Sequence, residues 1–226
     1  MDGGIPCRVQ RLGRIEYAPA LQRMQAFTQA RAADTIDEIW LLEHPPVYTL
    51  GLRARHRSVS HRNIPVVMAD RGGDVTYHGP GQPIVYVLLD LERRRLGIHE
   101  LVRTLEASVI DVLHDFGVEG MCKPGAPGVY VGEGKIAALG LRVRLGRSYH
   151  GMALNVSMDL SPFDSIDPCG YPGLRVTQIS ESRPDISVAD AGERLLNQVL
   201  SRLGYTDVSV TGTSPLESSN VHHVRR

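Results

Sequence analysis

Several features are scarce in this sequence of 226 residues, and each scarcity excludes a class of protein. No apolar run approaches the roughly 18 residues that a membrane-spanning helix needs, and the first residues offer no apolar signal-peptide region. The three cysteines, Cys7, Cys122 and Cys169, are an odd number in a chain without such a leader, which argues against a disulfide framework. We therefore expect a cytoplasmic protein with reduced thiols and no membrane partner.

The chain also lacks an excess of charge of either sign, and lysine is scarce in it. Twenty-five basic residues balance twenty-five acidic ones, so the chain lacks the positive charge that general nucleic-acid binding needs, and we expect no nucleic-acid partner. Lys123 and Lys135 are the only lysines, and every other basic residue is arginine. Lysine can become neutral inside a protein whereas arginine effectively cannot, so each lysine is a candidate for a chemical role.

The apolar pattern along the chain predicts one α/β domain of the α+β type. Helices are expected over 18–33, 98–116 and 187–203, the last with Ser187 as its N-cap, and strands over 37–43, 65–68, 83–89, 128–131, 135–144, 149–156 and 205–210. The strands between 128 and 156 are expected to form an antiparallel meander. Strands before and after a central helix favour a mixed β-sheet flanked by helices. We expect a single domain over 1–210 and a disordered tail over 211–226.

A glycine-rich segment, Arg71 to Gln82, separates two of the predicted strands. Four glycines in this segment indicate a backbone that takes positive φ or comes close to a ligand. The Gly-x-Gly-x-x-Gly spacing of a phosphate-binding loop is missing, and no helix start follows. Two interpretations remain, an elaborate loop and the backbone lining of a narrow ligand slot.

Lys135 follows Gly132-Glu133-Gly134, a sequence with a partial likeness to a P-loop. The first glycine of that motif is displaced by one position and Ile136 stands where its Ser or Thr belongs, so the P-loop interpretation fails. Lys135 instead opens a predicted strand of small and apolar residues. It is either a surface lysine at a hairpin or a functional group.

Cys169 lies in the turn Asp167-Pro168-Cys169-Gly170-Tyr171-Pro172-Gly173. The prolines and glycines exclude a helix interior or a central strand, so the thiol has little packed structure in which to be buried. We interpret Cys169 as an accessible, reactive thiol, and Cys7 and Cys122 as structural residues. Because zinc sites require Cys or His in close pairs, we expect no metal.

Four histidines stand at positions of interest: His44 before two prolines, His78 in the glycine-rich segment, His99 at a helix start and His150 beside Gly151. His78 and His150 lie at predicted loop edges. Each is either a general base or a hydrogen-bonded core residue, and the sequence leaves both interpretations open.

Five segments of the chain together carry a family resemblance. They are Glu43 to Gly51, Arg71 to Gln82, Gly134 to Gly140, His150 to Asn155 and Pro168-Cys169-Gly170. In this order they resemble the octanoyl-[acyl-carrier-protein]:protein N-octanoyltransferase family of lipoate biosynthesis, from about residue 8 to residue 205. The resemblance implies the fold of the biotin and lipoate protein ligase catalytic domains. It also implies an acyltransferase that moves an octanoyl group from acyl carrier protein to a lysine of lipoyl domains.

The resemblance also assigns roles to individual residues. Cys169 would be the acyl-thioester nucleophile, and Lys135 would lower the pKa of its thiol. No ATP, metal or other cofactor would be needed, because one thioester is exchanged for another. The acyl site would be lined by Arg71, Gly72, Gly73, Asp74, Val75, Thr76, Tyr77, His78, Ala138, Leu139, Gly140, Gly151, Met152 and Ala153.

The implied partners are octanoyl-acyl carrier protein as donor, and the lipoyl domains of 2-oxoacid dehydrogenases and the glycine cleavage H protein as acceptors. Three arginine clusters are candidate docking surfaces for acidic partners: Arg53, Arg55, Arg57 and Arg62; Arg93 to Arg95; and Arg142, Arg144 and Arg147. Two rival functions are an ATP-dependent lipoate or biotin ligase and a degenerate, non-catalytic binding protein. The Cys169 turn argues against the ligase, and retention of Cys169 and Lys135 argues against the degenerate protein.

Overall fold

An eight-stranded mixed β-sheet forms the centre of the protein in the computed structural model, which describes residues 5–54, 63–167 and 173–211. The strand order is β11-β1-β2-β6-β10-β9-β8-β7. Pairing is parallel between β1 and its two neighbours and antiparallel between the other strands. The strands are β1 (Ile5–Arg14), β2 (Asp37–Glu43), β6 (Ile84–Leu88), β7 (Met121–Lys123), β8 (Ala126–Val131), β9 (Gly134–Arg144), β10 (Arg147–Leu154) and β11 (Tyr205–Thr211).

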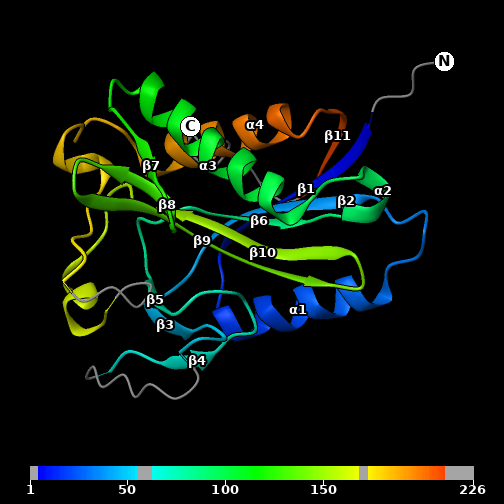
Figure 1. Ribbon diagram of the computed structural model, residues 1–226, viewed down its shortest axis with the longest axis horizontal. Coiled ribbons are helices and arrows are strands. Elements are labelled where there is room, and N and C mark those ends of the chain that lie inside the picture. Colours follow the sequence, from blue (N-terminus) through cyan, green and yellow to red (C-terminus); the bar gives the residue numbers. More distant parts are fainter. Residues whose placement is uncertain (1–4, 55–62, 168–172, 212–226) are drawn as a thin grey trace, which may run out of the picture.

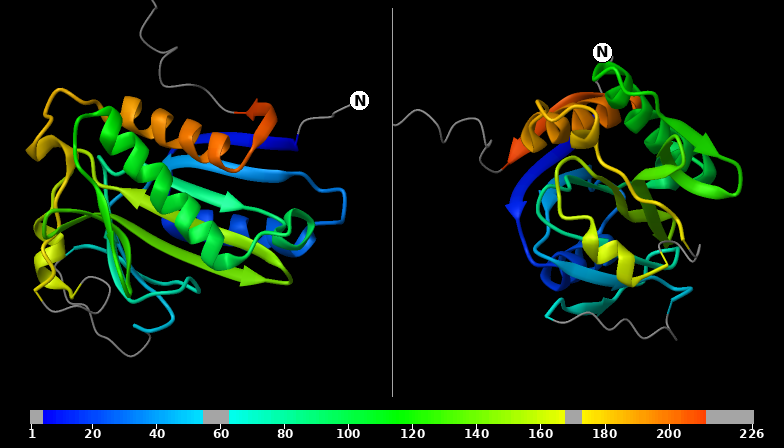
Figure 2. Two further views of the ribbon diagram at one scale, coloured as in Figure 1. Left: turned by 45° about the horizontal axis from the view of Figure 1, so that its top comes forward. Right: turned by 90° about the vertical axis from the view of Figure 1, so that its left-hand side faces the viewer.

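A second, three-stranded sheet with the order β4-β3-β5 lies beside the first. It consists of β3 (Val47–Leu50), β4 (Val66–Met68) and β5 (Val75–His78). The α-helices are α1 (Tyr17–Ala30), α2 (Leu91–Arg94), α3 (Ile98–Asp115) and α4 (Val188–Arg202), and two short 3-10 helices span Ser161–Ser165 and Ile179–Glu181. Helices α3 and α4 cover one face of the large sheet, while α1 and the small sheet lie on the opposite face (Figure 1). The views in Figure 2 show the same three layers from other sides.

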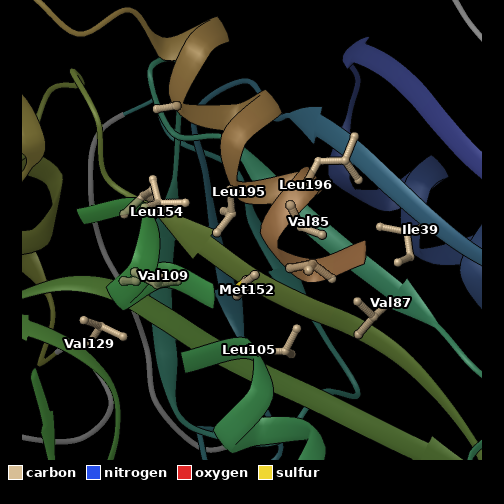
Figure 3. Close-up of a cluster of buried hydrophobic side chains, with 14 of the residues drawn as sticks. Ile39, Val85, Val87, Leu105, Val109, Val129, Met152, Leu154, Leu195 and Leu196 are labelled. Carbon is tan, nitrogen blue, oxygen red and sulfur yellow. The ribbon is translucent and has the colours of Figure 1, made fainter. Parts of the chain in front are cut away.

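The central strand β6 is buried on both faces because each face packs against a different layer. Val85 and Val87 point into the core formed with α3 and α4, where Leu105 and Leu195 meet them (Figure 3). The alternate residues of β6 belong to the core formed with α1. This confirms the prediction that 83–89 is a strand without a solvent-exposed face.

Most of the predicted elements are present within one to three residues of the expected ends. The apolar stripe over 98–116 forms α3, and the Ser187 side chain caps α4 by accepting from the backbone N–H of Asp190. The predicted meander is formed by β8, β9 and β10. The predicted fold class, a mixed sheet flanked by helices, is confirmed. None of the helices in the described part of the chain combines the length and apolar character needed to cross a membrane.

Other expectations are wrong. The glycine-rich segment 71–82 is not a loop throughout, because Val75–His78 forms the buried strand β5. Strands β1, β3 and β7 also went unpredicted. Thr211, placed in the expected tail, ends β11 instead, where its backbone pairs with Gln10. The rest of the expected tail, 212–226, lies outside the described residues.

Candidate active site

A pocket lies between α1, the strands β6, β9 and β10, and the segment that leads from Arg71 into β5. The empty space in and around it, counted together with open solvent, is ≈ 470 Å³. Its walls combine apolar side chains with a few polar ones, which suits a ligand with a hydrocarbon body. The lining residues are Tyr17, Arg71, Gly73, Asp74, Val75, Thr76, His78, Ile84, Tyr86, Ala138, Leu139, Gly140, His150, Gly151, Met152 and Ala153.

The pocket forms where β9 changes neighbours. β8 pairs with β9 only as far as Ala137, whereas the pairing of β9 with β10 continues to Arg144. Further along β9, the segment 71–74 takes the place of β8, and the backbone N–H of Gly72 donates to the carbonyl of Leu141 over 2.8 Å. The lining residues 138–140 lie between these two neighbours of the strand.

Arg71 holds the backbone of this segment in place. Its buried guanidinium donates to the carbonyl oxygens of Gly72, Asp74 and Thr49 at 2.8–3.0 Å, and to Oγ1 of Thr49 at 2.7 Å. A Cβ at Gly140 would lie 2.9 Å from Cδ of Arg71. Glycine at this position therefore lets the segment lie directly on β9.

The structure brings together all but two of the residues that the resemblance assigns to the acyl site. Gly72 contacts β9 through its backbone but does not line the pocket, and Tyr77 packs against Tyr48 and Phe163 in a separate cluster. Four lining residues were not in the assigned set: Tyr17, Ile84, Tyr86 and His150. Ile84 and Tyr86 are two residues apart on β6, so the sequence predicts that they share one face of the sheet. It does not predict that a pocket lies over that face.

Lys135 lies at the start of β9, three residues before the first lining residue, Ala138. Its side chain is buried, with only 4% of the residue exposed, so the interpretation as a surface lysine is wrong. The Nζ atom donates to the carbonyl of Pro127 at 2.7 Å and lies 5.5 Å from the centre of the Tyr130 ring. The structure therefore holds the amino group of Lys135 inside the protein, at the start of the strand that lines the pocket.

Gly128 makes room for the Lys135 side chain. It has a φ of +126°, and a Cβ here would lie 2.5 Å from Cε of Lys135 and 2.6 Å from the carbonyl oxygen of Ala137. From the other side, the buried carboxylate of Glu106 on α3 accepts from the backbone N–H of Gly128 at 2.8 Å. The β8 backbone is thus fixed against the lysine.

Cys169 lies outside the described residues, which resume at Gly173. The chain that follows it runs along Lys135: the Lys135 N–H donates to the carbonyl of Arg175 at 2.8 Å, and the Lys135 carbonyl accepts from Thr177 at 3.0 Å. The backbone bridge between Lys135 and Val176 is parallel, and Val176 is seven residues beyond Cys169.

The two cysteines that the structure describes are poor nucleophiles. Cys7 is buried in β1, where burial, and next the nearby Asp37, raises the pKa of its thiol to about 12. Cys122 is exposed on β7, and partial burial of its thiol together with Glu106 raises the pKa of that thiol. Both shifts disfavour the thiolate form.

Three of the four candidate histidines, His44, His78 and His150, are buried around the pocket with two tyrosines. Neighbouring ring centres lie 5.1 to 6.1 Å apart across the set Tyr17, His44, His78, Tyr86 and His150. Burial lowers the pKa of His44 to about 4 and that of His78 to about 3, and it lowers the pKa of His150 as well. All three imidazoles are therefore neutral at pH 7. The fourth, His99, is exposed in the first turn of α3.

The prediction that His150 lies at a loop edge is wrong, since it lies within β10 and has a φ of +62°. Successive strand residues normally face opposite sides of a sheet. The left-handed backbone at His150 instead lets Tyr149 and His150 stack, with ring centres 5.0 Å apart, and donate to the same carboxylate, that of Asp70. Gln25 on α1 donates to Asp70 as well. Burial alone would raise the pKa of Asp70, but these hydrogen bonds outweigh it and hold the pKa well below its usual range.

Two of the arginine clusters are partly used inside the protein. In one cluster, Arg93 and Arg94 pair with Asp37 at 2.7 and 3.8 Å, and in the other, Arg147 lies 4.0 Å from Asp90. Within the described part of the chain, Arg142 and Arg144 on β9 have no ion-pair partner. The cluster members Arg55, Arg57 and Arg62 lie outside the described residues. In the same described part, no group of three or more His, Cys, Asp or Glu side chains is arranged to hold a metal ion.

Comparison with known proteins identifies the family to which a protein with this fold and pocket belongs. The family model described as the lipoyl protein ligase A/B catalytic domain matches residues 16–200, and the chain belongs to this family. A lipoate-protein ligase A solved with ATP shares the fold, with a TM-score of 0.75 and 16% identity over 94% of this chain and 92% of its own.

Closer relatives are octanoyltransferases. The protein of Dechloromonas aromatica is 54% identical over 200 residues, which cover 88% of this chain and 98% of the relative. That of Azoarcus sp. is 55% identical over 201 residues, which cover 88% of both chains. The resemblance inferred from the five segments is confirmed, and the chain is an acyltransferase.

Proposed function

We propose that the protein transfers an octanoyl group from acyl carrier protein to a lysine of lipoyl domains, through a thioester on Cys169. The observation that carries the mechanism is the buried Lys135 at the start of the strand that lines the pocket. The substrate class is supported by relatives more than half identical to this chain that are octanoyltransferases.

In the first half-reaction the Cys169 thiolate attacks the carbonyl carbon of the carrier thioester. The new C–S bond forms as the carrier's C–S bond breaks, and the carrier leaves as a thiolate that takes a proton from Lys135. A free thiol has a pKa of about 8.5, so a neighbouring ammonium is needed to raise its thiolate fraction at neutral pH. The exchange of one thioester for another requires no ATP.

In the second half-reaction the amine of the acceptor lysine attacks the octanoyl carbon, a C–N bond forms, and the bond to Cys169 breaks. Lys135, left neutral by the first step, takes the proton of the amine and restores the ammonium beside the regenerated thiolate. Arginine could not take this proton, which gives a chemical reason for lysine in an arginine-rich chain. A backbone N–H group of 138–140 that faces away from β10 is the candidate donor to the oxyanion, because β8 pairs with β9 only as far as Ala137; residues 151–152 pair with both β6 and β9.

The octanoyl chain would lie in the pocket beside β9, against Val75, Leu139 and Met152. These residues provide the apolar wall, while Arg71 keeps the segment 71–74 closed over it. Acyl carrier protein is the proposed donor, and lipoyl domains of 2-oxoacid dehydrogenases and the glycine cleavage H protein are the proposed acceptors. An ATP-dependent ligase is disfavoured because the sequence identity to the octanoyltransferase of Dechloromonas aromatica, 54%, far exceeds the 16% identity to the lipoate-protein ligase A solved with ATP.

Intact mass after incubation with octanoyl-carrier protein, without ATP or added metal, tests the mechanism. We expect an octanoyl adduct on the wild type and on Cys122→Ser, the matched control that lacks an exposed thiol, and hydroxylamine should remove this adduct because it cleaves thioesters. We expect no adduct on Cys169→Ala. Both adduct-forming proteins should then octanoylate a lipoyl domain. An adduct on Cys169→Ala, or transfer that requires ATP, would show that the proposed mechanism is wrong.

A further inference from the structure

The pocket wall contains two histidines whose neighbours fix which ring nitrogen carries the proton. His78 Nδ1 lies 2.7 Å from Oε1 of Gln82, and Nε2 of the same amide donates to Oδ1 of Asn155 at 2.8 Å. The Gln82 oxygen can only accept, so His78 Nδ1 carries the hydrogen. Its Nε2 is then an acceptor, and within the described part of the chain it has no hydrogen-bond partner.

His150 is fixed by Asp70 in the opposite tautomer. Its Nε2 lies 2.8 Å from Oδ1 of the ionised Asp70, which can only accept, so Nε2 carries the hydrogen. The other nitrogen, Nδ1, is an acceptor that is fully buried and lacks a partner among the residues that the structure describes. His150 is 1% exposed and His78 is 7% exposed, and both line the pocket.

These two nitrogens place hydrogen-bond acceptors in a pocket wall that is otherwise largely apolar. A saturated acyl chain has no hydrogen to donate, so it leaves a buried acceptor unpaired, which is unfavourable. A hydroxyl group on the chain supplies the missing donor. Resting on the proposed function, we propose that His150 and His78 form a hydroxyl-binding subsite, through which the enzyme accepts hydroxylated acyl chains of about octanoyl length. Asp70 does not line the pocket and acts as a positioning residue that sets the tautomer of His150.

The subsite is tested with carrier protein loaded with octanoyl or with hydroxyoctanoyl chains that bear the hydroxyl on each of the carbons farthest from the thioester in turn. The quantity measured is the kcat/KM of each hydroxylated chain divided by that of octanoyl in the same protein, so a general loss of activity cancels. At the best hydroxyl position, this ratio should be about two- to tenfold higher in the wild type than in His150→Leu or His78→Leu. His99→Leu, the matched control at an exposed histidine, should keep the wild-type ratio. Equal ratios in the wild type and both pocket variants would overturn the subsite.

Asp70→Asn tests the positioning role by reversing the polarity of His150. Gln25 and Tyr149 both donate to Oδ2 of Asp70, so an asparagine keeps its oxygen there and turns its NH₂ group toward His150 Nε2. The His150 hydrogen then moves to Nδ1, which becomes a donor in the pocket wall. We expect a chain with an ether oxygen in place of one CH₂, which can only accept, to gain several-fold relative to octanoyl in Asp70→Asn compared with the wild type. An unchanged ratio would refute the role of Asp70.

The failure of the subsite can be told apart from that of the proposed function. If the wild type transfers no octanoyl group at all, the proposed function is wrong. Calorimetric binding of octanoic and hydroxyoctanoic acids to the same proteins then gives the corresponding ratios of Kd without any transfer. Ratios of Kd that are equal in the wild type, His150→Leu and His78→Leu would overturn the subsite by themselves.

Discussion

At the scale of single residues, Gly128 decides whether Lys135 can occupy its buried position. A methyl group at Gly128 would meet Cε of Lys135 at 2.5 Å, and the backbone φ of +126° is unfavourable for any other residue. We expect Gly128→Ala to lower the free energy of unfolding by about 2–4 kcal/mol and to reduce acyl transfer at least tenfold.

Gly132→Ala is the matched control, because Gly132 also has a positive φ, of +55°, but a Cβ there meets nothing within 4 Å. It should cost about 1 kcal/mol and leave transfer intact. Urea unfolding and transfer kinetics measure both, and equal losses in the two variants would contradict the role given to Gly128.

The proton on Lys135 separates the two half-reactions of the proposed mechanism. Lys135→Arg keeps a positive charge at the start of β9 but cannot take a proton from the acceptor amine. We expect acylation to persist, because the carrier thiolate can take its proton from water instead, while transfer from the acyl-enzyme falls about 10²-fold or more. Lys135→Met has no charge and should slow both steps. Single-turnover acylation followed by intact mass, and transfer to a lipoyl domain followed separately, distinguish the two variants. Normal transfer by Lys135→Arg would eliminate Lys135 as the base.

At the scale of elements, burial of the histidines between α1 and the strands ties stability to pH. His44 has a pKa of about 4 in the folded protein, against about 6.5 for an unfolded histidine. Between these values the unfolded chain binds a proton that the folded chain does not, so stability present at pH 7 is lost as the pH falls. We expect the free energy of unfolding to drop by about 1–2 kcal/mol between pH 7 and pH 5 for each such histidine.

The variant His44→Gln tests this effect. Its side chain can still donate to the Ile15 carbonyl and accept from the Tyr86 hydroxyl, but it does not titrate, so the variant should unfold with a weaker pH dependence. Identical slopes in urea unfolding at the two pH values would exclude His44 as a source of the effect.

The same elements show what the sequence can and cannot predict. Helix α3 and strand β6 were predictable because their apolar residues repeat at 3.6 and fill every position, respectively. Strand β5 was hidden, since Val75–His78 is short and lies between glycines, and its pairing with β3 depends on residues far away in the sequence. The left-handed backbone of His150 was not predictable, because the residue itself is not a glycine and Asp70, which stabilises it, is 80 residues distant. The pocket residues were assigned by family resemblance, whereas Tyr17 and Tyr86 join them only through packing.

At the scale of the whole molecule, the layers leave the arginines of the β9–β10 hairpin, among the basic residues that the structure describes, available to a partner. The β9–β10 hairpin extends beyond the pocket, and its Leu145 is 68% exposed. Arg144 is exposed beside it, and neither Arg144 nor Arg142 has an ion-pair partner in the described part of the chain, whereas Arg93 and Arg94 are engaged with Asp37. An acidic carrier protein would therefore find free positive charge on the hairpin rather than on the 93–95 cluster.

Charge reversal tests this docking surface. We expect Arg144→Glu to raise the KM for octanoyl-carrier protein by about three- to tenfold at low salt, because an attractive charge becomes repulsive at the rim of the complex. The difference from the wild type should shrink as salt is added, since exposed charges are screened beyond about 10 Å at 0.1 M ionic strength.

Arg103→Glu is the matched control for net charge and should leave KM unchanged. Arg103 is an exposed residue of α3, and α3 covers the face of the large sheet opposite α1 and the small sheet. A small octanoyl thioester without the carrier should react equally with all three proteins. If Arg144→Glu and Arg103→Glu have the same KM for the carrier, the hairpin is not the docking surface, because net charge alone would then account for any change.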